Sequence, residues 1–259
     1  MKKILSMLLV LCMALTLCSA AFAEGKSPVD GMTVAFIPKV SGNSFFEAAN
    51  DGAQKYAADW GLTVDYIGAP TADVTTQLEL IQQAIDKGVD AICISSVDAT
   101  GLDEKLQEAQ DAGIYVSTWD SDVSPNARAL MVSQGTADVL GPMLVDMAVE
   151  SLKERGVDVN GEVKYVWHFS NPSVSDQNSW YVAGDKYIKE KYPSWVAVHD
   201  PYYSNQDPAQ SVSVGESILD AYADVDVIIC NDSTALPGQC KAAENKGLTA
   251  KDITITGFC

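Results

Sequence analysis

The chain has 259 residues, of which 47% are hydrophobic and 20% are charged, and its formal net charge is −18. This composition is typical of a globular protein and excludes disordered, collagen-like and coiled-coil chains. The length suits one large α/β unit or two small domains, and the excess of acidic residues disfavours nucleic acid as a partner because it repels phosphate polymers.

Residues 1–23 have the pattern of a removable signal peptide. Two lysines precede an apolar run over residues 4–17, and Ala21-Phe22-Ala23 offers the small residues of a cleavage site. A lipid anchor on Cys18 stays open, although Leu17 is larger than the residue that lipoprotein processing usually requires. No later apolar run is long enough to cross a bilayer. We therefore expect a protein of the periplasm or of another extracytoplasmic part of the cell envelope.

Four cysteines follow the signal peptide, at positions 93, 230, 240 and 259. Cys93 and Cys230 lie inside apolar runs, which favours buried free thiols. A disulfide remains an alternative in an exported chain, but the spacings fit no small disulfide scaffold.

Short β-branched runs alternate along the chain with longer segments of helical periodicity. Strands are expected, in chain order, at residues 33–37, 63–67, 91–95, 115–118, 129–133, 163–167, 196–199, 227–230 and 253–256. Apolar residues three and four apart predict helices between most of these strands, for example over residues 46–60 and 138–155. The alternation predicts parallel sheets, and the apolar strands indicate sheets covered on both faces.

The alternation breaks once, and this break predicts a division into two lobes. The turn-rich segment 120–126 leads into the strand at 129–133 without an intervening helix, and a new α/β run begins at residue 134. We expect an α/β fold of two Rossmann-like lobes with parallel sheets, the first over 24–133 and the second over 134–259. Because the chain stops just after a strand, the C-terminal lobe is expected to be incomplete.

Polar side chains follow several strands, where parallel α/β sheets bind their ligands. A cleft of carboxylates, amides, one lysine and aromatic rings suits a small polyhydroxylated ligand, because the polar groups bond hydroxyls and the rings cover apolar C–H faces. The candidate site residues are Lys39, Asn43, Phe45, Trp119, Asp120, Asp176, Gln177, Asn231, Asp232 and Ser233.

Some of the same residues also have purely structural interpretations. A strand-end carboxylate such as Asp176 could simply cap the next helix. Phe46 fits the buried stripe of its helix and Phe45 does not, so Phe45 is the better cleft candidate. A lone lysine directly after Pro38 at a strand end, Lys39, is hard to explain by structure alone.

Signals for an enzyme are weak. The two histidines, His168 and His199, lie on different predicted strands, and no nucleophile elbow, phosphate-binding loop, zinc-protease or dinucleotide motif occurs. Asp120-Ser121-Asp122 is similar to a metal-binding D-x-D tripeptide, a signal of low specificity. We expect no metal, no cofactor and no catalysis. A sugar-modifying enzyme and a transcriptional effector domain are the less favoured alternatives.

Several stretches together carry a resemblance over nearly the whole chain. They are Phe36-Ile37-Pro38-Lys39, Phe45-Phe46, Gly52-Ala53-Gln54, Thr118-Trp119-Asp120-Ser121-Asp122, Gln134-Gly135-Thr136, Leu144-Val145-Asp146-Met147-Ala148 and Asp176-Gln177-Asn178 with Trp180. The chain resembles the extracytoplasmic sugar-binding proteins of ABC importers that have the ribose-binding-type fold. Within them it is most similar to the Lsr-type autoinducer-2 binding proteins. Rhamnose-binding relatives share much of the pattern but usually carry Asn at the position of Asp176.

The resemblance implies a type I periplasmic binding protein fold and a binding site shared between the lobes. Lys39 and Asp120 from the first lobe and Asp176 and Gln177 from the second would bond the hydroxyls of a cyclic, borate-free, furanose-like form of autoinducer-2. Asp232 matches another position beside the ligand.

The resemblance also implies a monomer that docks on an ABC permease in the membrane. Two positions depart from the family, which usually has Pro and Ala where this chain has Asn231 and Ser233. This difference leaves the ligand open between autoinducer-2 and rhamnose, ribose or another sugar.

Overall fold

The computed structural model describes residues 27–258. The expected signal peptide, Cys18 and Cys259 lie outside the described residues. No helix within the described part of the chain is long and apolar enough to span a membrane.

The first lobe is a five-stranded parallel sheet in the order β2-β1-β3-β4-β5. Its strands are β1 (Thr33–Ile37), β2 (Thr63–Tyr66), β3 (Ala91–Ile94), β4 (Tyr115–Trp119) and β5 (Leu130–Val132). Helices α3 (Val74–Lys87) and α4 (Asp103–Asp111) bury one face of the sheet, and α2 (Ser44–Trp60) packs on the other. As expected, no α-helix joins β4 to β5, and only the single turn η1 (Pro125–Ala127) lies between them.

The second lobe is built around a parallel sheet in the order β10-β9-β6-β7, and β8 also pairs with β6. Its strands are β6 (Lys164–Phe169), β7 (Val196–Ala197), β8 (Tyr202–Tyr203), β9 (Val227–Cys230) and β10 (Thr254–Gly257). Helices α5 (Ala137–Glu154) and α6 (Ser175–Lys191) cover one face, while α7 (Pro208–Ala221) and α8 (Ala235–Asn245) cover the other.

The strand expected at residues 196–199 is wrong in its extent. The structure has two short pieces on the same edge of β6, with β7 ending at Ala197 and β8 beginning at Tyr202. Pro201 lies between them, and a proline has no N–H to donate to a sheet. Sequence periodicity alone therefore missed β8 and the loop that follows it.

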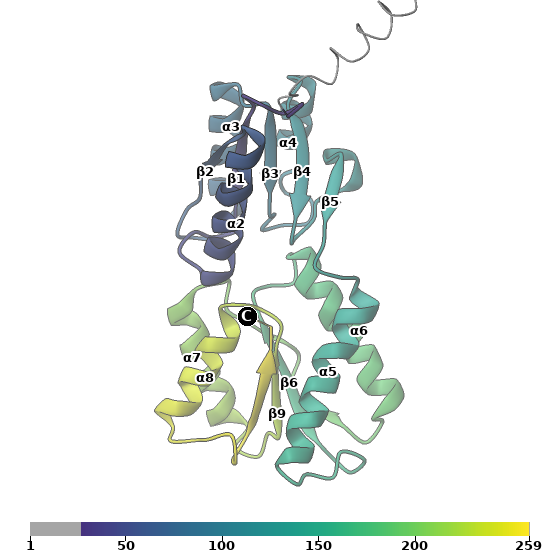
Figure 1. Cartoon of the computed structure of the whole chain (residues 1–259). Coiled ribbons are helices and arrows are strands. Elements are labelled where there is room, and N and C mark those ends of the chain that lie inside the picture. Colours follow the sequence, from purple (N-terminus) through teal and green to yellow (C-terminus); the bar gives the residue numbers. More distant parts are fainter. Residues whose placement is uncertain (1–26, 259) are drawn as a thin grey trace, which may run out of the picture.

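The two lobes lie end to end, with the carboxyl ends of the first sheet turned toward the second lobe (Figure 1). The expected division at residues 133–134 falls in the connection between β5 and α5. The α/β class and the two lobes with parallel sheets are confirmed.

Cys93 and Cys230 are free thiols, and Cys230 is buried while Cys93 is partly exposed.

Helices α5 and α6 approach each other closely at two glycines. A Cβ atom on Gly141 would lie 2.6 Å from the backbone nitrogen of Gly184 and 2.7 Å from the carbonyl oxygen of Trp180. A Cβ atom on Gly184 would meet the ring of Trp167 at 2.7 Å. Since real Cβ atoms do not approach backbone this closely, the two glycines fix the position of α6 on α5.

The Gly141→Ala variant is expected to lower the free energy of unfolding by about 1–3 kcal/mol, because the added methyl group meets backbone that cannot move alone. Gly52→Ala in α2 is the matched control, since nothing lies within 4 Å of its added methyl group. The control should be stabilised by about 0.5–1 kcal/mol through its lower chain entropy and better helix propensity. Urea unfolding measures both, and equal stability of Gly141→Ala and wild type would contradict the close-packing argument.

Candidate ligand-binding site

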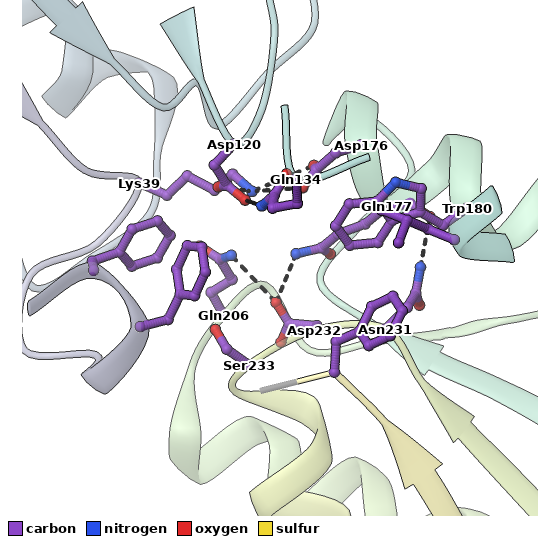
Figure 2. Close-up of a pocket in the computed structure, with 14 residues that line it drawn as sticks. Lys39, Asp120, Gln134, Asp176, Gln177, Trp180, Gln206, Asn231, Asp232 and Ser233 are labelled. Carbon is purple, nitrogen blue, oxygen red and sulfur yellow. Dashed lines mark hydrogen bonds and ion pairs between the residues drawn. The ribbon is translucent and has the colours of Figure 1, made fainter. Parts of the chain in front are cut away.

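A cavity of about 160 Å³ lies between the lobes. This volume is below the roughly 300–1,000 Å³ of pockets for drug-sized ligands, so the cavity suits a small molecule. Both lobes contribute to the wall, which Figure 2 shows in close-up. The lining residues are Lys39, Phe45, Phe46, Asp120, Gln134, Leu140, Asp176, Gln177, Trp180, Gln206, Asn231, Asp232, Ser233 and Phe258.

Eight of the ten candidate site residues from the sequence line this one cavity. They are Lys39, Phe45, Asp120, Asp176, Gln177, Asn231, Asp232 and Ser233. They come together where the carboxyl ends of the two sheets point toward each other (Figure 1). At this place the loops after β1, β4, β6 and β9 meet the first turns of α2 and α6. That is the location expected from the rule that parallel sheets bind ligands at the carboxyl ends of their strands.

The Lys39 ammonium group lies between two carboxylates from different lobes. Its Nζ is 2.9 Å from Oδ2 of Asp120, which follows β4, and 3.4 Å from Oδ1 of Asp176 in the first turn of α6. Lys39 is only 3% exposed. A buried ammonium group must be paired, because losing its hydration without compensation costs several kcal/mol.

Each carboxylate is held by further side chains. Asp120 accepts hydrogen bonds from Ser95 Oγ at 2.7 Å and from Gln134 Nε2, and Asp176 accepts one from Ser121 Oγ. Asp120 also has a left-handed backbone with φ 60°. Such a conformation is uncommon outside glycine and is tolerated best by Asp and Asn. The backbone thus fixes the direction in which Asp120 presents its carboxylate.

The ionisation of this cluster is shifted by burial and by charge. Burial alone would lower the pKa of Lys39, but Asp120 and Asp176 raise it above its ordinary value. Burial raises the pKa of Asp176 to about 6, against the opposing effect of Lys39. Asp176 therefore changes its charge near neutral pH, whereas Lys39 stays positively charged.

Asp232 is the centre of a second hydrogen-bonded group on the opposite wall. Its Oδ1 accepts the backbone N–H groups of Thr234 at 3.0 Å and Ala235 at 2.7 Å. Its Oδ2 accepts the side-chain amides of Gln177 at 2.8 Å and Gln206 at 3.2 Å. A carboxylate offers about four acceptor sites. The protein itself fills those of Asp232, which consequently orients the two glutamines.

The two residues that depart from the resembled family have defined partners. Asn231 Nδ2 donates to the backbone carbonyl oxygen of Gln177 at 2.6 Å. Ser233 Oγ lies 3.1 Å from Nδ2 of Asn43, which belongs to the first lobe. One replacement therefore fixes the first turn of α6, and the other adds a hydrogen bond between the lobes.

The structure does not place the other two candidates, Asn43 and Trp119, in the cavity wall. Asn43 is the N-cap of α2, where its Oδ1 accepts the N–H of Phe45, and its amide reaches across to Ser233. Trp119 stacks on Phe36 with ring centroids 4.7 Å apart and belongs to the core under α2. The carboxyl-end rule pointed to both positions but could not tell which way each side chain points.

Sequence reasoning missed several residues of the wall. Phe46 was assigned to the core, and it is 1% exposed, yet it also lines the cavity. Gln134 directly follows an expected strand, so the same carboxyl-end rule could have found it. Gln206 follows β8, which the sequence did not reveal. Leu140 and Phe258, also missed, add apolar surface, as does Trp180, which belongs to the resemblance stated above.

Two parallel-sheet lobes that enclose a polar cavity define the class of two-lobed solute-binding proteins. A family model described as the periplasmic binding protein domain matches residues 34–259. The chain belongs to the periplasmic binding protein family, and the expected type I fold is confirmed. The expectation of a binding protein rather than an enzyme is also confirmed, because the relatives are periplasmic sugar-binding proteins.

Among solved structures, the chain is similar to LsrB from Clostridium saccharobutylicum in complex with AI-2. The two are 60% identical with a TM-score of 0.87, over 88% of this chain and 71% of that one. A D-ribose/D-allose-binding protein of Pseudomonas aeruginosa is 28% identical over 100% of this chain and 81% of its own. A solute-binding protein of Clostridium phytofermentas with bound L-rhamnose is 24% identical, with a TM-score of 0.79 over 86% and 67% of the two chains, and shows the shared fold alone.

The raised pKa of Asp176 makes a prediction about stability. Between about pH 4 and pH 6 the unfolded carboxyl group is ionised while the folded one keeps its proton, so raising the pH through this window destabilises the fold. Asp176→Asn lacks this titration. Its stability relative to wild type should therefore rise between pH 4 and pH 7, by an amount on the order of 2 kcal/mol.

Urea unfolding at pH 4, 5, 6 and 7 measures this difference. Asp65→Asn is the control, because Asp65 forms an ion pair with Lys87 at the protein surface. A difference between Asp176→Asn and wild type that stays constant with pH, or that falls, would contradict the assignment of a raised pKa.

Proposed function

We propose that this protein captures autoinducer-2, in a cyclic and borate-free furanose-like form, and delivers it to an ABC permease. The observation that carries the proposal is the lysine–carboxylate cluster that both lobes build around one small cavity. The 60% identity with LsrB in complex with AI-2, over 88% of this chain, supports the same ligand. The molecule would act as an extracytoplasmic monomer that closes around its ligand.

The charge of the cavity favours a neutral ligand. One ammonium group, Lys39, faces the carboxylates of Asp120, Asp176 and Asp232. An anion such as a borate ester would meet a surplus of negative charge in a buried setting, where repulsion is weakly screened. Neutral hydroxyl groups can instead donate to carboxylate oxygens and accept from the ammonium group.

The remaining wall suits a compact ring with apolar edges. Phe45 and Phe46 line the cavity, and Leu140, Trp180 and Phe258 add further apolar surface. Aromatic faces pack well against the C–H groups of a small ring. Polar groups from both lobes, together with aromatic rings, match a ligand with hydroxyls on more than one edge.

A second candidate ligand is another sugar such as ribose or rhamnose. The specific observation in its favour is the pair Asn231 and Ser233, which bring an amide and a hydroxyl to positions where the resembled family usually has Pro and Ala. Such groups could retune the cavity toward a different pattern of hydroxyls.

Mass spectrometry of the small molecule that copurifies with the protein tests the proposal, together with calorimetry using autoinducer-2, D-ribose and L-rhamnose. We expect autoinducer-2 both in the extract and as the tightest binder, with the ligand recovered intact after incubation. Tight binding of a sugar with no binding of autoinducer-2 would refute the proposed ligand, and chemical change of the ligand would refute the binding role.

Asp120→Ala and Asp176→Ala are each expected to weaken binding of the ligand by at least about 100-fold. The reason is that each change removes charge-assisted hydrogen bonds and leaves Lys39 with one partner fewer in a buried site. Calorimetry measures affinity and circular dichroism checks the fold. Asp65→Ala, at an exposed ion pair, is the control and should bind as wild type does. Unchanged affinity in either cavity variant would remove that carboxylate from the site.

A further inference from the structure

Two side-chain oxygens in the cavity wall are buried without a hydrogen-bond partner among the residues that the structure describes. They are Oε1 of Gln206 and Oδ1 of Asn231, and both belong to the second lobe. Gln206 is 4% exposed and Asn231 is 0% exposed. A buried carbonyl oxygen without a partner is unfavourable, because it has lost its hydrogen bonds to water. Most buried polar groups in proteins are paired, so these two indicate where a ligand would supply donors.

The orientation of the Gln206 amide follows from its neighbour. Its Nε2 donates to Oδ2 of Asp232 at 3.2 Å, and Asp232 offers only acceptors when ionised. Turning the amide over would place its oxygen against the carboxylate, which is repulsive. The carboxylate therefore holds Oε1 away from itself, and Figure 2 shows Gln206 on the cavity side of Asp232, across from Lys39 and Asp120.

The backbone around Gln206 is strained and firmly anchored. Asn205 and Gln206 are consecutive non-glycine residues in the left-handed region, with φ 51° and 56°. This conformation is unfavourable for a residue with a Cβ atom, more so for Gln206 than for Asn205, since Asn tolerates it better. The loop is tied to the end of β6, because the N–H groups of Ser204 and Asn205 both donate to the carbonyl oxygen of Ser170. Strain of this kind persists where the surroundings enforce it, often at binding sites.

We propose that Gln206 is a further ligand-binding residue that determines specificity, with Oε1 accepting a hydrogen bond from one ligand hydroxyl. This inference rests on the proposed function in one respect, namely that the cavity binds a hydroxylated ligand. A ligand with hydrogen in place of that hydroxyl leaves Oε1 unpaired and is rejected. Asp232 supports the contact as a positioning residue, since it holds the amide in the required orientation.

The first experiment compares Gln206→Met with wild type by calorimetry with autoinducer-2. The methionine side chain has nearly the same length but no acceptor and no amide, so we expect binding to be about 10- to 100-fold weaker. Gln54→Met is the matched control, because Gln54 is an exposed glutamine of α2 that does not line the cavity and does not contact the loop of Gln206. The control should bind as wild type does. Unchanged affinity of Gln206→Met would overturn the proposal.

The second experiment separates direct contact from general support of the site. Analogues of autoinducer-2 that lack one hydroxyl at a time are measured against wild type and Gln206→Met. Direct contact predicts that wild type discriminates about 10- to 100-fold against one analogue, whereas the variant binds that analogue and autoinducer-2 within about 3-fold. A variant that weakens all ligands by the same factor would show a purely structural role and overturn the proposal. The comparison of analogues on the wild-type protein can be made even if Gln206→Met does not fold, and equal affinity of wild type for all analogues would also overturn the proposal.

The outcomes also distinguish this proposal from the proposed ligand. If wild type binds D-ribose and not autoinducer-2, the proposed ligand fails, and the same comparison is made with D-ribose and with analogues of D-ribose that lack one hydroxyl at a time. If Gln206→Met no longer discriminates between D-ribose and the analogue that wild type rejects, the contact of Gln206 is supported. If the variant still discriminates as wild type does, the contact is refuted. A wild-type protein that binds none of these hydroxylated probes would overturn both proposals.

Discussion

The cavity depends on one buried ammonium group. Lys39 is buried between the two lobes and has lost most of its hydration, so its charge has to be compensated by carboxylates. One of these carboxylates comes from each lobe. Asp120 comes from the loop after β4 and Asp176 from the start of α6, and their distances from Nζ set the relative position of the two sheets at this point. The three side chains thus connect the fold of each lobe to the geometry of the site.

This arrangement has a chemical consequence for recognition. The unusual backbone of Asp120 and its hydrogen bonds from Ser95 and Gln134 fix the direction of its carboxylate. On the facing wall, the acceptor sites of Asp232 are used within the protein, and its role is to aim two amides. Recognition is therefore divided between charged groups of one wall and neutral amides of the other.

Most residues of the cavity wall could be predicted from the sequence, and the residues that were not predicted have a physical explanation. Strand ends are visible in hydropathy, which is why Lys39, Asp120 and Asn231 were found. Gln206 was not predicted because it follows β8, and Pro201 separates β8 from β7 so that the short β8 has no clear signal in the sequence. Phe46 was assigned to the core because periodicity reports burial, and a cavity wall is as buried as a core. Asn43 and Trp119 show that a position at a strand end does not determine where its side chain points.

The glycine contact between α5 and α6 bears on how such a receptor could change its specificity. With Gly141 and Gly184 in van der Waals proximity to the facing backbone, α6 cannot slide or rotate without losing the contact. The scaffold under Asp176, Gln177 and Trp180 is therefore stiff. Natural variation toward new cargo would have to proceed by exchanging individual side chains on an unmoving frame, rather than by shifting helices.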